Sequence, residues 1–198
     1  GGFEHNLQSL RVVDELEAKY ADFPGLNLMF ETREGILKHC SLRNARELGD
    51  VGERFLRREQ PSLEAQLANV ADAIAYNHHD VDDGSRGGLL TVHQLLDEPL
   101  FAACHRAVED AHPEIDERRL VYEVIRRMID MVVTDLIEAT RARLDAAGPA
   151  SIEDVRQHGS VLVGFSDEVE AQHLSLKRFL MANLYKHDKV REMTDRAK

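Results

Sequence analysis

Apolar residues recur along most of the chain at intervals of three and four, which is the spacing of an amphipathic helix. The longest such pattern covers residues 116–147 and ends at Gly148-Pro149, so it predicts a helix long enough to span a core. We find no internal repeat and no ladder of alternating strands, so the predicted fold class is all-α. The predicted helices are residues 3–20, 33–39, 62–81, 91–96, 99–111, 116–147, 151–158 and 166–185, with at most a brief extended piece at 161–165.

Polar residues at the ends of these patterns predict where helices begin and end. Thr32, Ser62 and Ser166 can each act as an N-cap. The acidic stretch Asp82-Asp83-Gly84 through Gly88 is expected to close the helix that Ser62 opens, as a turn.

The chain has 198 residues, 43% of them apolar, which suits one compact helical domain over residues 1–198. No apolar run approaches the length of a membrane span and no leader is recognisable, so we expect a cytoplasmic protein with no membrane partner. Cys40 and Cys104 are far apart and are expected to be packed thiols. The chain begins at Gly1 without Met and helical patterning starts at once, which predicts a piece of a longer protein.

The formal charge of −11 and the pI near 5.4 disfavour nucleic acid as the main partner, because binding phosphates along a duplex needs a dense basic surface. A row of arginines on the 116–147 helix could still hold a polyphosphate. For any one of these arginines the alternative is a solvated position paired with a nearby carboxylate. The row consists of Arg118, Arg119, Arg126, Arg127, Arg141 and Arg143.

The sequence Glu64–Gly84 places polar side chains on one face of a helix. Asp72, Tyr76 and Asp80 are four residues apart, so at about 100° per residue they form a single stripe. Apolar neighbours such as Ile74 are numerous enough to bury this face, and a buried aspartate needs a cation, a partner or a proton. The candidate chemistry is metal-assisted hydrolysis of a nucleotide. One carboxylate is not a metal site, however, and from the residues alone a helix with a few buried polar groups is the favoured alternative.

The other motifs in the sequence give weaker evidence of function. The dipeptides His79-Asp80 and His187-Asp188 do not form a metal-binding pair by themselves, because adjacent helical residues point about 100° apart. His78 and His79 are expected either to be exposed or capping residues or to have a catalytic role. The acidic turn after Asp80 does not fit a calcium loop, since its glycine comes fifth. The glycine-rich phosphate, dinucleotide and serine-hydrolase motifs are absent from the sequence.

Several longer motifs, in order and with matching spacing, resemble the deoxyguanosinetriphosphate triphosphohydrolase family of the HD superfamily. The resemblance covers nearly the whole chain. It implies a partial HD-type helical bundle that corresponds to the C-terminal portion of a longer hydrolase. The motifs are residues 3–13, 23–28, 31–39, 64–84, 176–180 and 183–187.

The resemblance also implies roles for individual residues. Asp72 would be the last ligand of a divalent metal, Mn or Mg, whose first His and His-Asp pair would lie upstream of Gly1. Tyr76 would lie against the deoxyribose, and Asp80 would accept a hydrogen bond from its 3′-hydroxyl. His5 would be an active-site histidine that approaches the phosphates. Arg118 and Arg119 are offered as phosphate contacts.

The implied reaction converts a deoxynucleoside triphosphate such as dGTP to deoxynucleoside and triphosphate, in a homo-oligomeric enzyme. Because its upstream ligands are missing, the chain alone is expected to be inactive. One alternative is a non-catalytic nucleotide-sensing or oligomer-forming lobe. Another is an HD phosphohydrolase acting on cyclic or 5′-monophosphate nucleotides, which the Asp72/Tyr76/Asp80 pattern makes less favoured.

Overall fold

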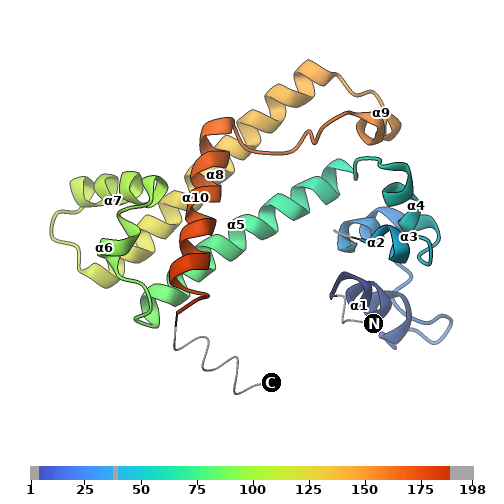
Figure 1. Ribbon diagram of the computed structural model, residues 1–198, viewed down its shortest axis with the longest axis horizontal. Helices are drawn as coiled ribbons and strands as arrows, with labels where there is room; N and C mark the ends of the chain where they lie inside the picture. The colour runs from blue at the N-terminus through green and yellow to red at the C-terminus, as the bar shows by residue number, and fades with distance from the viewer. Residues whose placement is uncertain (1–4, 38–39, 188–198) are drawn as a thin grey trace. The chain divides into compact units, whose positions relative to one another are not determined.

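The computed structural model describes residues 5–37 and 40–187, and every regular element in these ranges is a helix (Figure 1). The predicted all-α class is therefore confirmed. The elements are α1 (His5–Arg11), a π-helical turn η1 (Val12–Leu16), α2 (Phe30–Ile36), α3 (Leu42–Ala45), α4 (Asp50–Arg57), α5 (Leu63–Arg86), α6 (Val92–Leu95), α7 (Pro99–Ala111), α8 (Glu117–Ala147), α9 (Ile152–Gln157) and α10 (Asp167–Asn183).

The chain divides into two compact units. The first comprises residues 1–71 and 142–163, and the second comprises residues 72–141 and 164–198. The helices α5 and α8 each contribute residues to both units. The prediction of a single domain over residues 1–198 stays a prediction.

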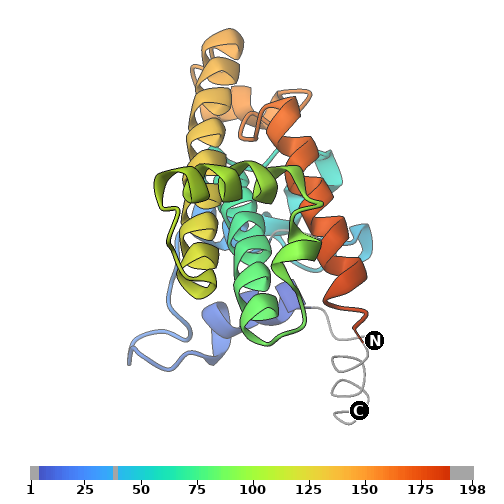
Figure 2. The same cartoon turned by 90° about the vertical axis from the view of Figure 1, so that its left-hand side faces the viewer.

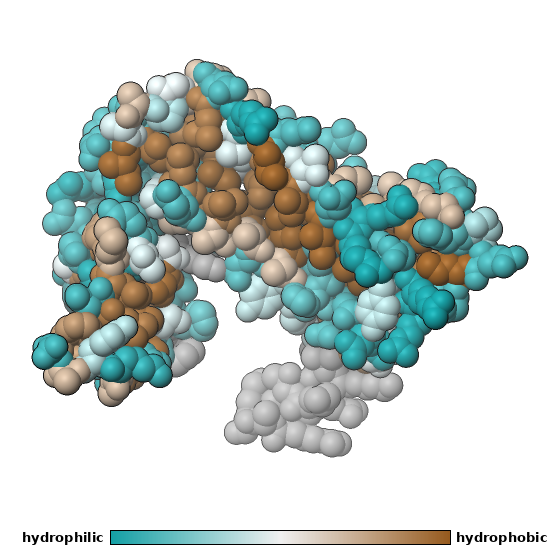
Figure 3. Space-filling model, turned by 180° about the vertical axis from the view of Figure 1, so that it is seen from behind, coloured by the Kyte–Doolittle hydropathy of each residue, from teal (hydrophilic) through white to brown (hydrophobic). Residues whose placement is uncertain are grey.

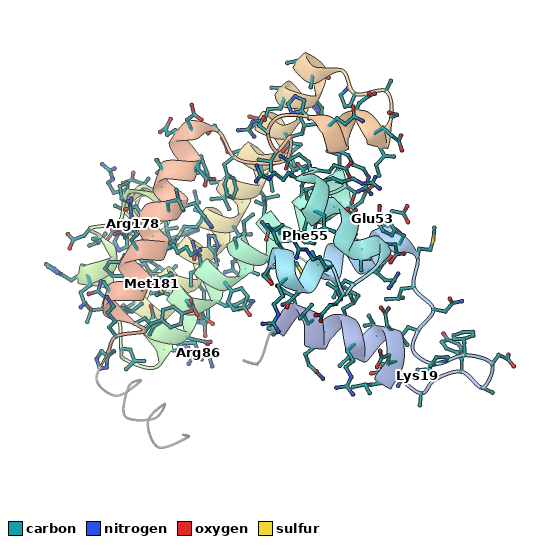
Figure 4. All side chains as sticks on the ribbon, turned by 45° about the vertical axis from the view of Figure 1, so that its right-hand side comes forward. Lys19, Glu53, Phe55, Arg86, Arg178 and Met181 are labelled. Atoms are coloured by element: carbon teal, nitrogen blue, oxygen red, sulfur yellow. The ribbon has the colours of Figure 1, made fainter. Side chains whose placement is uncertain are left out.

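The first unit has a core under α1, α2 and α4, three helices that contact one another through α2. Leu10, Leu37 and Val51 are buried at its centre, and Phe30 and Phe55 pack against them. Burying such side chains stabilises each by about 1.5–3 kcal/mol relative to exposure. The side chain of Phe55 is labelled in Figure 4, together with Glu53 on the same helix.

The second unit is built from the later part of α5, most of α8, and helices α6, α7 and α10. In Figure 2, α7 runs across the direction of α5 and α8, and it contacts α10. Phe101 of α7, Met128 of α8 and Leu176 of α10 are completely buried or nearly so, which places the core of this unit among these helices.

Five of the predicted helices, α6 to α10, match the structure to within two residues at each end. In three of them the local signal that fixes an end is clear. Helix α7 begins at Pro99, where a missing N–H costs nothing, and ends at Ala111 as predicted. Helix α8 ends before Gly148, whose φ of +55° suits glycine. Ser166 caps α10 by accepting a hydrogen bond from the backbone N–H of Val169.

Other boundaries were predicted wrongly. The first helix ends at Leu16 rather than Tyr20, because the chain turns back and Gly25 packs on it: a Cβ at Gly25 would lie 2.3 Å from the carbonyl oxygen of Asp14. Thr32 lies inside α2 rather than capping it, since α2 begins at Phe30 and ends at Ile36. Residues 38 and 39, the end of that predicted helix, lie outside the described residues.

The acidic stretch after Asp80 is helical, which contradicts the predicted turn. Helix α5 continues to Arg86, and the turn follows at Gly87 and Gly88. Gly84 lies inside the helix, where a Cβ would be 2.6 Å from Leu90 Cδ1, so the Leu90 side chain packs directly on the glycine. The structure also contains two helices that the pattern did not predict, α3 and α4. The predicted extended piece at 161–165 is not a strand.

Some large apolar side chains remain at the surface. In Figure 3, brown apolar residues reach the surface among teal polar ones. On α8 the exposed examples are Ile129, Met131 and Ile137. In the described part of the chain no helix is long and apolar enough to cross a membrane.

Candidate functional site

The stripe of Asp72, Tyr76 and Asp80 lies on α5 as the spacing predicts, but it faces outward. Asp72 is exposed, Tyr76 is 62% exposed and Asp80 is half-buried. The prediction that apolar neighbours bury this face is wrong. Ile74 lies about 200° around the helix from Asp72, and His78 lies about 200° from Tyr76. Both Ile74 and His78 are buried, so the face of α5 that packs against the core is the one opposite the stripe. The stripe is therefore accessible to a ligand in this chain.

Asp80 is held by a residue far away in the sequence. The hydroxyl of Tyr185, just after α10, donates a hydrogen bond to Asp80 Oδ2. This bond raises the pKa of Tyr185 to about 12, with smaller contributions from partial burial and from the negative charge of Asp80. Tyr76 also raises the pKa of Tyr185 electrostatically, so Tyr76, Asp80 and Tyr185 form one local group.

Behind the stripe, the buried face of α5 carries a second polar group. Asn77 is 5% exposed, and its amide Nδ2 donates to the backbone carbonyl of His173 at 3.3 Å. The same amide lies 3.2 Å from Nε2 of the His173 ring, which can accept its other hydrogen when neutral. The ring also packs on Phe165, with centroids 5.1 Å apart. These contacts fix α10 against α5.

His78 is buried beside this group, so neither an exposed nor a capping histidine describes it. Its Nδ1–H donates to the carbonyl oxygen of Ile74 at 2.6 Å, while its Nε2 is buried with no hydrogen-bond partner. Burial lowers the pKa of His78 and lowers that of His173 to about 4, with the neighbouring His78 a further cause for His173. Both rings are therefore uncharged at neutral pH. His79, by contrast, is exposed.

The other predicted site residues lie elsewhere. His5 is exposed at the start of α1 in the first unit, with Nδ1 3.5 Å from the side-chain oxygen of Asn6. Arg118 and Arg119 are exposed in the first turn of α8 in the second unit. Arg119 pairs with Asp116 at 3.3 Å, which agrees with the solvated alternative for this residue. The convergence of His5, Arg118 and Arg119 on the α5 stripe stays a prediction.

Within residues 5–37 and 40–187, no group of three or more His, Cys, Asp or Glu side chains could hold a metal ion. Asp72 suits one position in a metal site, since it is an exposed carboxylate, but this part of the chain does not complete such a site. Of the two cysteines, Cys104 is buried as predicted and Cys40 is partly buried.

Comparison with known proteins shows which class of protein this chain resembles. Residues 163–198, which include α10 and Tyr185, match the family described as phosphohydrolase-associated domain. The whole chain is similar to proteins named deoxyguanosinetriphosphate triphosphohydrolase-like protein. It is 57% identical to that of Bordetella pertussis over 197 residues, 56% to that of Ralstonia nicotianae over 198, and 53% to that of Thiobacillus denitrificans over 197.

The alignments cover 100% of this chain in each case, but only 51% or 52% of those relatives. The chain belongs to the deoxyguanosinetriphosphate triphosphohydrolase-like family, and it spans about half the length of the curated relatives it matches. The predicted family is confirmed.

The sequence pattern missed Tyr185 and His173 as members of this site. Tyr185 lies within a motif that carries the family resemblance, which was the available signal. His173 lies within an ordinary helical pattern that does not single it out, and its contact with Phe165 is known only from the structure.

Proposed function

We propose that this chain is part of a metal-dependent phosphohydrolase that converts deoxynucleoside triphosphates, dGTP-like, to deoxynucleoside and triphosphate. The observation that carries the proposal is the exposed stripe of Asp72, Tyr76 and Asp80 on α5, in a chain of this family. A ring and a carboxylate four residues apart suit a sugar, since one offers a flat face and the other accepts from a hydroxyl. The upstream half of the complete protein would supply the remaining metal ligands.

The residues of this chain would then act as follows. Asp72 would hold a divalent metal, Mn or Mg, as one ligand among several. When bound, such an ion lowers the pKa of a coordinated water and polarises a phosphoryl oxygen. Tyr76 would lie against the deoxyribose and Asp80 would accept from the 3′-hydroxyl.

Phosphate binding would fall to positively charged or hydrogen-bonding groups. His5 would approach the phosphates as the histidine of the active site. Arg118 and Arg119 would contact the phosphate oxygens, because both side chains are exposed and therefore accessible to a ligand. Homo-oligomer formation and a cytoplasmic location stay predictions for the complete protein.

The test compares the complete protein with an Asp72→Ala variant, measuring triphosphate release from each dNTP in Mn or Mg. We expect activity in the parent and its loss in the variant. Asp130→Ala is the matched control, because Asp130 is an exposed aspartate on α8 outside the stripe. Full activity in Asp72→Ala would contradict the metal-ligand role, and stepwise release of single phosphates would favour the monophosphate-type hydrolase.

A second candidate is a non-catalytic nucleotide-binding lobe, and the lack of a three-ligand metal group among the described residues is expected under both candidates. The complete reading frame distinguishes the two. A His and a His-Asp pair upstream of Gly1 would support the hydrolase, and their absence would support the binding lobe.

A further inference from the structure

We infer that Tyr185 is a positioning residue for the sugar site, which orients the Asp80 carboxylate toward the 3′-hydroxyl of the substrate. The inference rests on the proposed function and assigns a task to the segment that follows α10. Tyr185 and Asp80 are 105 residues apart in the sequence, so their contact is made by the fold rather than by local spacing.

The first support is the hydrogen bond itself. Tyr185 donates to Asp80 Oδ2, and a carboxylate accepts through both of its oxygens. The bond leaves Oδ1 to accept from another donor and restricts rotation of the carboxylate. Tyr185 is 44% exposed and Asp80 is half-buried, so a ligand approaching the α5 stripe meets this pair at the surface.

The second support is that the backbone around Tyr185 is fixed. Leu184 is 8% exposed, and its Cδ1 lies 3.3 Å from where a Cβ of Gly84 would stand, one turn beyond Asp80 on α5. The backbone N–H groups of Leu184 and Tyr185 both donate to the carbonyl of Leu180, at 2.9 and 3.2 Å. Tyr185 therefore reaches Asp80 from an anchored position. Met181, labelled in Figure 4, marks the last turn of α10 in this region.

The third support is chemical. The pKa of Tyr185, raised to about 12, keeps the phenol protonated over the neutral and mildly alkaline range, so it remains a donor there. Hydrogen bonds to a charged acceptor are stronger than those between neutral groups. An aspartate oriented in this way needs no reorganisation when a hydroxyl binds, which is the advantage of a preorganised site.

The alternative is that Tyr185 only packs α10 against α5. The two roles differ in one measurable respect. A positioning residue acts through the 3′-hydroxyl, so its effect depends on that hydroxyl, whereas a packing residue affects all substrates alike.

The experiment uses the complete protein and compares Tyr185→Phe with the parent on dGTP and on 2′,3′-dideoxy-GTP, which lacks the 3′-hydroxyl. We expect kcat/KM for dGTP to fall by roughly tenfold, the order expected for losing one hydrogen bond to a charged group. For the dideoxy substrate we expect little change. Tyr20→Phe, at an exposed tyrosine of the first unit, is the control and should leave both values unchanged.

Asp80→Asn provides a second variant. It should show the same dependence on the 3′-hydroxyl, and the double variant should lose less than the sum of the two single effects, because the residues act as a unit. Equal losses on both substrates, or no loss on either, would overturn the positioning role while leaving the hydrolase proposal intact. A parent protein that releases no triphosphate from dGTP would instead refute the proposed function, and the inference with it.

Discussion

Glu34 and Arg156 are 122 residues apart in the sequence, yet the Arg156 guanidinium donates two hydrogen bonds to the Glu34 carboxylate, at 2.9 and 3.2 Å. Glu34 is 1% exposed. Arg54 is the second cation beside it, with Nε 3.2 Å from Oε1, and burial is the main cause that lowers the pKa of Arg54. The carboxylate thus holds α2, α4 and α9 of the first unit together.

Replacing Glu34 should be costly for the first unit. Glu34→Gln removes the charge that compensates two largely buried arginines, and breaking such a buried pair costs about 3–5 kcal/mol of unfolding free energy. Urea unfolding followed by circular dichroism measures the change. The control is Glu53→Gln, since Glu53 pairs with Arg57 on the exposed surface of α4, where a loss of at most about 1 kcal/mol is expected. Equal losses in the two variants would contradict the buried network.

Two helical glycines of the first unit should respond oppositely to alanine. A Cβ at Gly52 in α4 would lie 2.0 Å from the carbonyl oxygen of Ala45, which is backbone and cannot move aside cheaply. We expect Gly52→Ala to destabilise the protein by about 3 kcal/mol, the upper end for overpacking. At Gly35 in α2 the nearest atom is Ala65 Cβ, 4.0 Å away.

Gly35→Ala should therefore be neutral or stabilise the protein by up to about 1 kcal/mol, through the better helix propensity of alanine. Melting temperatures of the two variants, recorded side by side, check the prediction. A Gly52→Ala protein as stable as Gly35→Ala would show that α3 and α4 are packed less closely than the structure indicates.

The regular elements could be predicted where sequence signals are local. Pro99 at the start of α7, Gly148 after α8 and Ser166 before α10 each act on the backbone within a few residues, so the pattern contains their effect. The turn after Asp80 was predicted too early: α5 continues through Gly84 to Arg86, and the backbone N–H groups of Leu89 and Leu90 then close the turn on the Gly84 carbonyl. The packing of Leu184 beside Gly84 comes from the far end of α10, 100 residues away, which no local signal reveals.

The candidate site was predictable only in part. Helical periodicity places Asp72, Tyr76 and Asp80 on one face, but it does not say whether that face is the buried one. The partners could not be predicted, because Tyr185 meets Asp80 and His173 meets Asn77 across separations of 105 and 96 residues. Such contacts depend on how α10 packs against α5.

The pH dependence of stability should carry a contribution from His173. Its pKa is lowered from 6.5 to about 4 by burial, so as the pH falls below about 6.5 the unfolded chain binds a proton that the folded chain does not. This stability is present above pH 6.5 and is lost as the pH falls toward about 4. His78, whose pKa is lowered by the same cause, contributes in the same direction.

Replacing His173 by Gln keeps a polar side chain beside Asn77 but removes the titration. Urea unfolding of both proteins across this pH window should show a smaller decline for His173→Gln. His112→Gln, at an exposed histidine after α7, is the control and should decline as the parent does. Parallel curves for the parent and His173→Gln would contradict an uncharged buried ring.

Discrimination between deoxyribonucleotides and ribonucleotides should depend on Tyr76. Its ring is 62% exposed on the α5 stripe, where a bound sugar would lie against it, and a 2′-hydroxyl would be crowded by the ring. In the complete protein, Tyr76→Ala should reduce the preference for dGTP over GTP, measured as the ratio of kcat/KM values, by roughly tenfold or more. Tyr76→Phe keeps the ring and should keep the preference. If Tyr76→Ala retains full discrimination against GTP, the residue that excludes the 2′-hydroxyl lies elsewhere, and the contribution of α5 to sugar recognition is limited to Asp80.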